Sequence, residues 1–398
     1  MKKIRNIAAG LAVCLAFSAV PVHASSDVIT FLEFPLEATI SENTRVLTLE
    51  EAFVLARRNN SSIDALNDAI VFSEQQRREL VVSHDNAWRF GMGLLDHTAE
   101  QLARGIRSID QAGANAPAQR RMMDTVSDFL VLNSVNTIRS LELDLIILNE
   151  SIAVDTVSLN HLELRNRLGM ASNNEVTTAR TVLEMSRAQL RAVNIGLESQ
   201  RAGLNHLLGL PSNADVVIEH DFSVEVGNIS EHVGDIHSFT DRQIARDPSI
   251  QILRRQHETA RNNYSTTQNW VQNVFQTQPT QILNWETNAT DRANMEIAVS
   301  NASRDLTDAT DNMRENIRTT YNQLRQLEEQ NSALLLDLQT SLYLFDSMKV
   351  MNSAGMATQH EVDSLRVLLL VAESNLAKNA LNHEVLMFAF ESPFLLGR

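Results

Sequence analysis

Cysteine, glycine, proline and aromatic residues are all scarce in this chain, and each shortage argues against a class of structure. The 398 residues include one cysteine, 13 glycines and 7 prolines, and only 5% are aromatic. Few glycines and prolines leave little material for the turns of a β-sandwich, whereas abundant Leu, Ala, Glu, Gln, Asn and Arg favour long helices. After residue 20 there is no apolar run of 18 residues or more, which argues against a helical membrane anchor.

The N-terminus has the three parts of a secretory signal. Three positive charges within the first five residues precede an apolar stretch, residues 7–20, that is too short to span a bilayer. Residues 22–24 (VHA) then fit a small-residue cleavage site. We therefore predict that residues 1–24 are a signal peptide, that residues 25–45 are an N-terminal extension, and that the mature chain is exported.

Removal of the signal peptide changes the thiol content and the charge. It takes away Cys14, the single cysteine, so neither a disulfide nor cysteine–zinc chemistry is expected in the mature chain. It also removes three positive charges and no negative ones, which takes the net charge from −15 to −18. Such an acidic surface argues against nucleic acid and an anionic membrane as partners, and it is compatible with cationic solutes or a basic protein.

The first half of the chain opens with short helices. Thr48 followed by Glu51 forms a capping box, which satisfies free backbone donors in the first turn of a helix. The apolar residues that follow recur at helical spacing until residues 59–62 (NNSS) break the pattern. A second helix is expected over residues 63–83.

A long helix and its return follow. Residues 123–168 contain no glycine or proline, and at about 1.5 Å per residue they would form a helix roughly 65 Å long. A helix of that length normally runs beside others in a coiled coil. Residues 173–208 read as the returning helix, closed by Gly209 and Pro211. The apolar stripe of the long helix is predicted to comprise Val126, Leu130, Asn133, Thr137, Leu141, Leu145, Leu148, Ile152, Leu159 and Leu162.

The second half begins after a linker. Residues 212–236 contain the β-favouring stretches 216–218 and 222–226, so we predict a linker with one or two short strands. Helical periodicity returns near Phe239, and the longest helix is expected over residues 293–351. A coiled-coil seam is predicted there, with Ile317, Leu324, Asn331, Leu338 and Phe345 on one seven-residue series and Leu327 and Leu334 on its partner series.

The two halves share a turn sequence. Residues 169–176 (GMASNNEV) match residues 355–362 (GMATQHEV) at five of eight positions, with Ser/Thr as a sixth match. Any good helical turn favours glycine and Ser/Thr-x-x-Glu, but the shared Met, Ala and Val and the same place within each half favour a duplication. We expect a mostly α-helical chain with little β-structure, built from two tandem repeats of long antiparallel coiled-coil hairpins, residues 46–211 and 237–398.

At this point the sequence resembles the TolC family of outer-membrane efflux proteins. Residues 47–52 (LTLEEA) followed by Asn59 and Asn60 are similar to the opening of that family's first repeat, and residues 245–250 (ARDPSI) to that of its second. Residues 207–211 (LLGLP) resemble the end of the first repeat. The turns at Gly169 and Gly355 resemble the family's periplasmic tips. Together these matches cover nearly all of the mature chain.

The resemblance implies an architecture and partners. Three protomers would assemble into a hollow α-barrel in the periplasm, continued by a β-barrel in the outer membrane. The tips would meet a periplasmic adaptor that belongs to an inner-membrane efflux pump. The positions matching the adaptor-contacting turns are Arg167, Leu168, Gly169, Met170, Ser353, Ala354, Gly355 and Met356. Acids that constrict the pore would be Glu175, Glu361 and Asp363, although Ser364 stands where the family often has a second acid.

One part of the sequence departs from the family. Membrane-crossing strands need about 9–11 residues that alternate between apolar and polar. Residues 84–122, which fill the first slot for such strands, show helical spacing instead, and the second slot, residues 266–291, is barely long enough for two crossings. We expect a helical relative whose transmembrane β-barrel is reduced or absent.

Catalytic and metal sites are not expected. His220, His232 and His237 gather loosely in the linker, but none has a ligand spacing such as two histidines four apart on a helix. No serine-elbow or phosphate-loop motif occurs, so we predict neither an enzyme nor a bound cofactor. Polar residues on the apolar stripes, such as Asn133, Thr137 and Asn331, either set the register of a coiled coil or face the lumen of a channel.

Two functions remain open from the sequence. The first is a TolC-like efflux duct component, a passive homotrimeric conduit in the outer membrane and periplasm for solutes exported by a partner pump. The second is a barrel-less helical scaffold or adaptor-binding protein of the cell envelope, soluble in the periplasm or at the cell surface, that transports nothing itself.

Overall fold

The computed structural model describes residues 45–89, 97–220, 224, 226–277 and 285–396. The chain divides into two units, Met1–Thr44 and Arg45–Arg398, and the described residues all belong to the second. The predicted signal peptide and all of the predicted extension except Arg45 lie outside the described residues.

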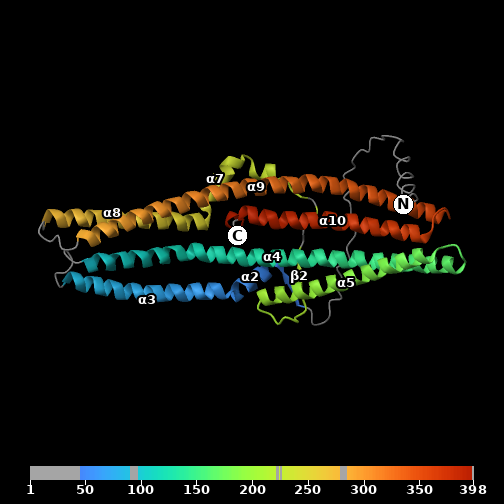
Figure 1. The fold of residues 1–398 in the computed structure, drawn as a ribbon, viewed down its shortest axis with the longest axis horizontal. Helices are drawn as coiled ribbons and strands as arrows, with labels where there is room; N and C mark the ends of the chain where they lie inside the picture. The colour runs from blue at the N-terminus through green and yellow to red at the C-terminus, as the bar shows by residue number, and fades with distance from the viewer. Residues whose placement is uncertain (1–44, 90–96, 221–223, 225, 278–284, 397–398) are drawn as a thin grey trace. The chain divides into compact units, whose positions relative to one another are not determined.

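Helices make up most of the described chain, as Figure 1 shows, so the expected helical fold class is confirmed. In chain order the elements are β1 (Arg45–Thr48), α2 (Leu49–Asn59), α3 (Ser61–Arg89), α4 (His97–Arg167), α5 (Asn173–Leu207), β2 (Val216–Glu219), α6 (Ile229–Val233), α7 (Ile236–Arg246), α8 (Pro248–Thr277), α9 (Trp285–Ser353), α10 (Gln359–Glu391) and a final 3-10 turn, Pro393–Leu395.

The first hairpin consists of α4 and α5. At 71 residues, α4 starts well before the predicted residue 123 and is longer than α9, which has 69, so the expectation that the second long helix would be the longest was wrong. The helix continues through Pro117, although a proline removes one backbone hydrogen bond. One turn away, the guanidinium of Arg255 on α8 donates to the carbonyl of Ala114. A tertiary contact thus supports the helix where the proline weakens it.

The second hairpin consists of α9 and α10, and its predicted seam is confirmed. Ile317, Leu324, Asn331 and Leu338 of α9 are buried, and Phe345 packs against the cluster that contains Leu338. The α10 side supplies a matching buried series at seven-residue spacing: Val362, Leu369, Leu376, His383 and Phe390. Two helices that bury residues every seven positions against each other form an antiparallel coiled-coil pair.

The stripe predicted for α4 is only partly correct. Leu130 is 42% exposed and Asn133 is exposed, whereas Val131 and Val135 are buried in the core of the first repeat. This helix packs against α2, α3, α5, α8 and α10 along its length. A helix with neighbours on several sides buries more than one stripe, so a single narrow series does not identify its core face.

A two-stranded parallel sheet joins the segment just before α2 to the linker. β1 pairs with β2 in the register Leu47 to Ile218, and both of these side chains are buried in the first-repeat core. The strand at residues 216–218 was predicted, but β1 and the short helix α6 were not. The second predicted strand, residues 222–226, falls largely outside the described residues.

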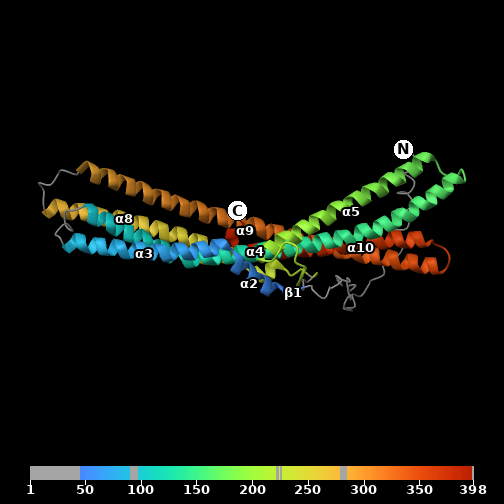
Figure 2. The ribbon, with the colours of Figure 1, turned by 90° about the horizontal axis from the view of Figure 1, so that it is seen from below.

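The two repeats pack side by side. α10 lies against α4, and Figures 1 and 2 show these two helices adjacent. Charged pairs cross this contact: Lys378 Nζ lies 2.5 Å from Asp144 Oδ1, and Arg366 lies 3.3 Å from Glu150. Farther from the tips, α4 meets α8, where Arg107 donates to Asn263 Oδ1 at 2.7 Å. In the half of the molecule that contains α5 and α10, the four helices lie side by side in the order α5, α4, α10, α9.

Both slots for membrane-crossing strands are helical where they are described. α3 continues to Arg89 and α4 begins at His97, as the helical spacing predicted, and α8 extends to Thr277. Among the described residues, no helix has the length and hydropathy that a membrane span requires.

Candidate functional site at the hairpin tips

The first tip is a glycine-centred turn after the end of α4. Gly169 has φ 73°, a left-handed conformation that favours glycine. The N–H of Met170 donates to the carbonyl of Arg165 at 2.7 Å, and the N–H of Gly169 donates to that of Asn166 at 2.9 Å. The side chain of Asn166 then donates to the carbonyl of Ala171 at 2.9 Å. These bonds satisfy the last carbonyls of the helix and fix the reversal.

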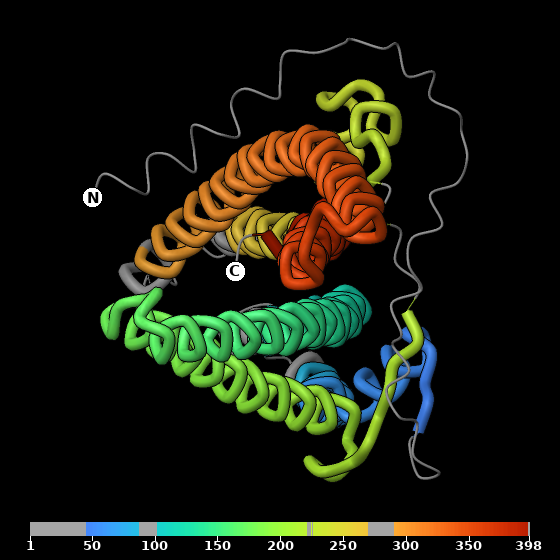
Figure 3. The backbone as a smooth tube through the Cα atoms, turned by 90° about the vertical axis from the view of Figure 1, so that its right-hand side faces the viewer, coloured from blue at the N-terminus to red at the C-terminus, as the bar shows by residue number. Residues whose placement is uncertain are grey.

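The second tip repeats this arrangement atom for atom. Gly355 has φ 74°, its N–H donates to the carbonyl of Asn352 at 2.9 Å, and the N–H of Met356 donates to that of Met351 at 2.9 Å. The side chain of Asn352 donates to the carbonyl of Ala357 at 3.1 Å. Figure 3 shows the two hairpin ends, α4–α5 in green and α9–α10 in orange and red, from the tip side. Each tip thus has an asparagine three residues before its glycine that makes the same hydrogen bond. The comparison of residues 169–176 with 355–362 missed it, because both asparagines lie before those ranges.

Both returning helices begin with the predicted capping box. Ser172 accepts from the N–H of Glu175 at 3.2 Å, and Glu175 Oε2 accepts from the N–H of Ser172 at 2.7 Å. Thr358 and Glu361 make the same pair of bonds at 3.3 and 2.7 Å. The bond from the Thr358 N–H, followed by that from its hydroxyl, holds the pKa of Glu361 below its usual value. Glu175 and Glu361, two of the three candidate pore acids, are thus already engaged at their own helix ends.

Loss of one cap is expected to weaken the fold measurably. We expect Thr358→Ala to lower the free energy of unfolding by about 1 kcal/mol, because the N–H of Glu361 then loses the Thr358 hydroxyl as an acceptor and keeps only the Thr358 carbonyl. Chemical denaturation followed by circular dichroism measures the change. Thr358→Ser, which keeps the hydroxyl, should lie within about 0.5 kcal/mol of the wild type, and an equal loss in both variants would rule out the cap as the cause.

The tips present apolar side chains to solvent. Leu168, Met170 and Met356 are 65–70% exposed. Arg167, Gly169, Ser353, Ala354 and Gly355 are exposed as well, so all eight residues predicted to contact an adaptor are accessible in the monomer. Large apolar side chains held outward on rigid turns are the kind of surface that a protein partner covers.

The third candidate acid has a different environment. Asp363 Oδ1 accepts a hydrogen bond at 2.8 Å from the side chain of Gln359, one turn earlier in α10. Ser364, at the position where the family often carries an acid, donates its hydroxyl to the carbonyl of His360 at 2.7 Å. The structure therefore places Glu361 and Asp363 in the first turns of α10, and Glu175 in the first turn of α5.

The linker histidines separate in space, and two of them lie beside carboxylates of α10. His220 Nε2 lies 2.8 Å from Glu384 Oε1 on α10, and His232 Nε2 lies 3.6 Å from Glu391. Within the described residues, no group of three or more His, Cys, Asp or Glu side chains is arranged to hold a metal. These histidines attach the linker to the last helix.

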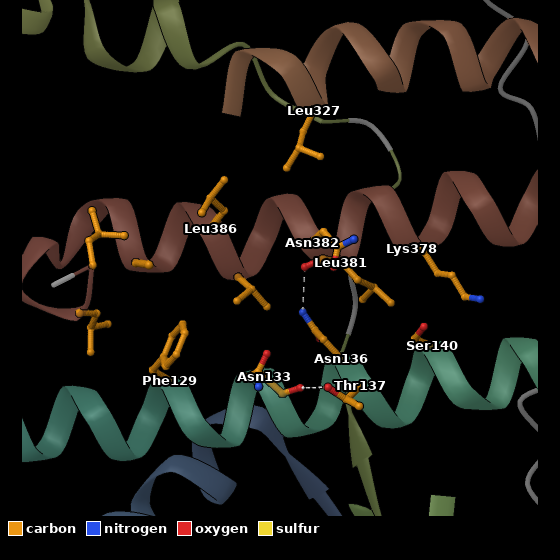
Figure 4. Close-up of a pocket in the computed structure, with 14 residues that line it drawn as sticks. Phe129, Asn133, Asn136, Thr137, Ser140, Leu327, Lys378, Leu381, Asn382 and Leu386 are labelled. Carbon is orange, nitrogen blue, oxygen red and sulfur yellow. Dashed lines mark hydrogen bonds between the residues drawn. The ribbon is translucent and has the colours of Figure 1, made fainter. Parts of the chain in front are cut away.

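The polar residues of the long helices have two different roles. Asn331 is buried in the α9–α10 seam, where its Oδ1 accepts from Asn379 Nδ2 at 3.2 Å. Asn133 and Thr137 instead line an open groove of about 550 Å³ between α4 and α10, which Figure 4 shows. At the base of this groove Asn136 donates to the carbonyl of Leu381 at 3.2 Å. Asn331 therefore matches the register-setting interpretation, and the other two are groove-lining.

α10 also buries titratable groups that the sequence pattern did not reveal. Glu373 is 8% exposed, and its Oε2 has no hydrogen-bond partner among the described residues. Burial raises the pKa of this carboxyl. His383 Nε2 lies 3.7 Å from Glu328 Oε1, and burial lowers the pKa of His383 although Glu328 opposes the shift. A heptad pattern does not distinguish a buried acidic residue such as Glu373 from an exposed one, so the sequence could not predict this burial.

The raised pKa of Glu373 predicts a pH-dependent stability difference. A carboxyl whose pKa is higher in the folded state contributes stability below its unfolded value of about 4.3, and that contribution is lost as the pH rises through the folded value. Glu373→Gln should therefore unfold like the wild type near pH 4 and be more stable at pH 8, by on the order of 1 kcal/mol. Melting curves across this range test the difference, and a wild type more stable at pH 8 would contradict it.

Comparison with known proteins gives a match at the level of structure. No protein-family model matches the sequence, and no curated protein matches it. The outer membrane protein VceC from Vibrio cholerae is similar with a TM-score of 0.61 and 12% identity, over 88% of this chain and 96% of that one. The outer-membrane channel OprN is similar with a TM-score of 0.63 and 10% identity, over 90% and 95%. The CmeC outer membrane channel of Campylobacter jejuni is similar with a TM-score of 0.62 and 10% identity, over 88% and 86%.

These likenesses extend over nearly the whole length of each chain, while the identities are low. They therefore bear on the fold alone. The chain has the fold of a TolC-like helical-barrel protomer.

Proposed function

We propose that this protein is a TolC-like duct component, a homotrimeric passive conduit for solutes that a partner pump exports. The observation that carries the proposal is the fold, two long hairpins with equivalent tips, combined with an exposed apolar stripe on α9 and an exposed, partly apolar stripe on α5. A passive conduit needs no catalytic group, because the free energy of transport comes from the pump. The helix order α5, α4, α10, α9 supports the proposal, because neighbouring copies could extend such a wall at its two edges.

The edge helix α9 carries a second seam. Leu336, Tyr343 and Val350 lie seven residues apart and are 64–73% exposed. Leu338 of the buried seam is two positions from Leu336, which at about 100° per residue places the two series on opposite sides of the helix. One face of α9 is thus buried against α10, and the other repeats the same spacing toward solvent.

The other edge helix, α5, carries a corresponding stripe. Leu183 and Leu197 lie on the buried side of α5, and Leu197 belongs to the first-repeat core. On the outward side a series with alternating spacings of four and three is exposed: Thr178, Val182, Met185, Gln189 and Ala192. Exposed residues at the spacing of a coiled-coil seam predict a helix partner.

Pairing of the α5 edge of one copy with the α9 edge of the next would bury both stripes. Because the two edges differ, the contact is head-to-tail, and head-to-tail contacts generate a ring when the rotation closes. The TolC-like fold supports closure with three copies. A lumen enclosed by this ring would be the solute path, with the outer membrane and periplasm as its location.

The tips supply the second part of the proposal. We infer that the turns at Arg167–Met170 and Ser353–Met356 contact a periplasmic adaptor, and that Glu175, Glu361 and Asp363 narrow the pore behind them. The exposed Leu168, Met170 and Met356 support the first inference, because their burial by a partner would be favourable. The position of the acids in the first turns after the tips supports the second.

The test combines assembly with conduction. Native mass spectrometry of the detergent-extracted outer membrane fraction should give three copies, and the purified trimer should form conducting pores in planar bilayers. If the protein is instead recovered in osmotic-shock fluid and forms no conducting pores, the scaffold function is supported and the duct function is refuted. A trimer that conducts but does not bind its adaptor would leave the conduit intact and overturn the role of the tips.

A further inference from the structure

Two histidines from different repeats meet below the tips. His161 lies near the end of α4, and His360 is the second residue of α10. Their ring centroids are 6.2 Å apart, with an angle of 66° between the ring planes. The two residues belong to separate hairpins and are distant in sequence. No local spacing motif therefore predicts that they meet.

The pair has an unexplained polar atom. His360 Nδ1 is buried and has no hydrogen-bond partner among the described residues. His161 is exposed, so solvent reaches the pair from its side. A buried polar atom without a partner points to an unmet ligand such as a water molecule or an ion.

The charged groups around the pair are occupied elsewhere. Glu163 on α4 is held by Arg180 at 2.7 Å, Glu361 closes the capping box, and Asp363 accepts from Gln359. Among the described residues no ion pair joins one of these carboxylates to either imidazole, although the charge of His360 contributes to the lowered pKa of Glu361. The two imidazole rings are therefore the side chains available to bind an ion, and water would complete its coordination.

We propose that His161 and His360 together bind a divalent transition-metal ion of the Zn²⁺, Ni²⁺ or Cu²⁺ class. Two Zn–N bonds of about 2.0–2.1 Å reach across at most about 4.2 Å between nitrogens. Ring centroids 6.2 Å apart leave room for one ion between the rings when a nitrogen of each ring turns toward the other. Neutral imidazole is a ligand for these ions, whereas Mg²⁺ and Ca²⁺ require oxygen donors.

A metal ion at this place would join the two hairpins. α4 ends at Arg167, six residues after His161, and α10 begins one residue before His360. The ion would thus connect the end of the first ascending helix to the start of the second returning helix. This inference concerns one copy of the chain and does not depend on the proposed function.

Isothermal titration of the full mature chain with ZnCl₂ at pH 7.5 tests the proposal. We expect the wild type to have one more Zn²⁺ site than His161→Gln and His360→Gln, or to bind Zn²⁺ at least about 10-fold more tightly than either. His206→Gln, which changes an exposed histidine on α5, serves as the matched control and should bind like the wild type. MgCl₂ should give no binding at this site.

Two further readouts separate ligation from a structural effect. Binding should weaken at acidic pH, because protonated imidazoles do not bind metal. Zn²⁺ should raise the melting temperature of the wild type and of His206→Gln, and circular dichroism should show that all variants are folded. Equal Zn²⁺ stoichiometry and affinity in the wild type and both site variants would overturn the proposal, as would binding that is unchanged at pH 5.

Discussion

Replacement of Phe390 by alanine is expected to lower the free energy of unfolding by about 3–5 kcal/mol. Phe390 is fully buried near the end of α10. Its ring stacks on Phe239 of α7 with centroids 4.8 Å apart, and it lies 6.5 Å from the ring of Tyr321 on α9. The side chain therefore joins three helices of the second repeat, and its loss leaves a cavity that these long helices cannot readily close.

Urea unfolding followed by circular dichroism measures this effect. Leu368→Ala on the same helix is the control, since Leu368 is half exposed and its truncation should cost no more than about 0.5 kcal/mol. A loss in Phe390→Ala no larger than that of the control would show that the stacked cluster adds little. A change in the slope of the transition would indicate a more open native state instead.

Tyr343→Asp is expected to prevent self-association while leaving the monomer folded. Tyr343 is the centre of the exposed α9 stripe and is highly exposed in the single chain, so a charge there costs the monomer little. In the assembled ring the same position would be buried against α5 of the next copy. A buried carboxylate without a partner costs several kcal/mol, which corresponds to a weakening of association by at least about 100-fold.

Light scattering and native mass spectrometry of Tyr343→Asp distinguish the outcomes. Tyr343→Phe keeps the apolar ring and should assemble like the wild type. Asp337→Ala, which changes an exposed residue off the stripe, should assemble as well. Assembly of Tyr343→Asp with unchanged stoichiometry would show that this face of α9 is not the contact.

Local signals predicted the hairpins well because helix ends are determined by nearby residues. The capping boxes at Thr48, Ser172 and Thr358 need only a hydroxyl and a glutamate three positions later, and all three form. The left-handed glycines Gly169 and Gly355 lie where the repeat placed them. The buried α9 seam was equally predictable, because a seven-residue repeat in a helix of that length requires a partner.

Long-range contacts account for what was missed. β1 forms because residues 45–48 pair with β2, about 170 residues later in the chain. A stretch of four residues is too short to show the alternation that would predict a strand. α4 begins before the predicted residue 123 and continues through Pro117, because a contact from Arg255 of α8 supports the helix there. The stripe on α4 failed near Leu130 because several helices surround that segment, and periodicity identifies one apolar face at a time.

The amino-acid sequence by itself determined the helices, the two equivalent reversals and the caps after them, since each depends on residues within one or two turns. Only the tertiary structure decided which side chains of those helices are buried. It brought His161 to His360, buried Glu373, and left Leu336, Tyr343 and Val350 facing solvent. The physical reason is that the pairing of distant helices is set by the packing of complete side-chain surfaces, which no short segment of the chain contains.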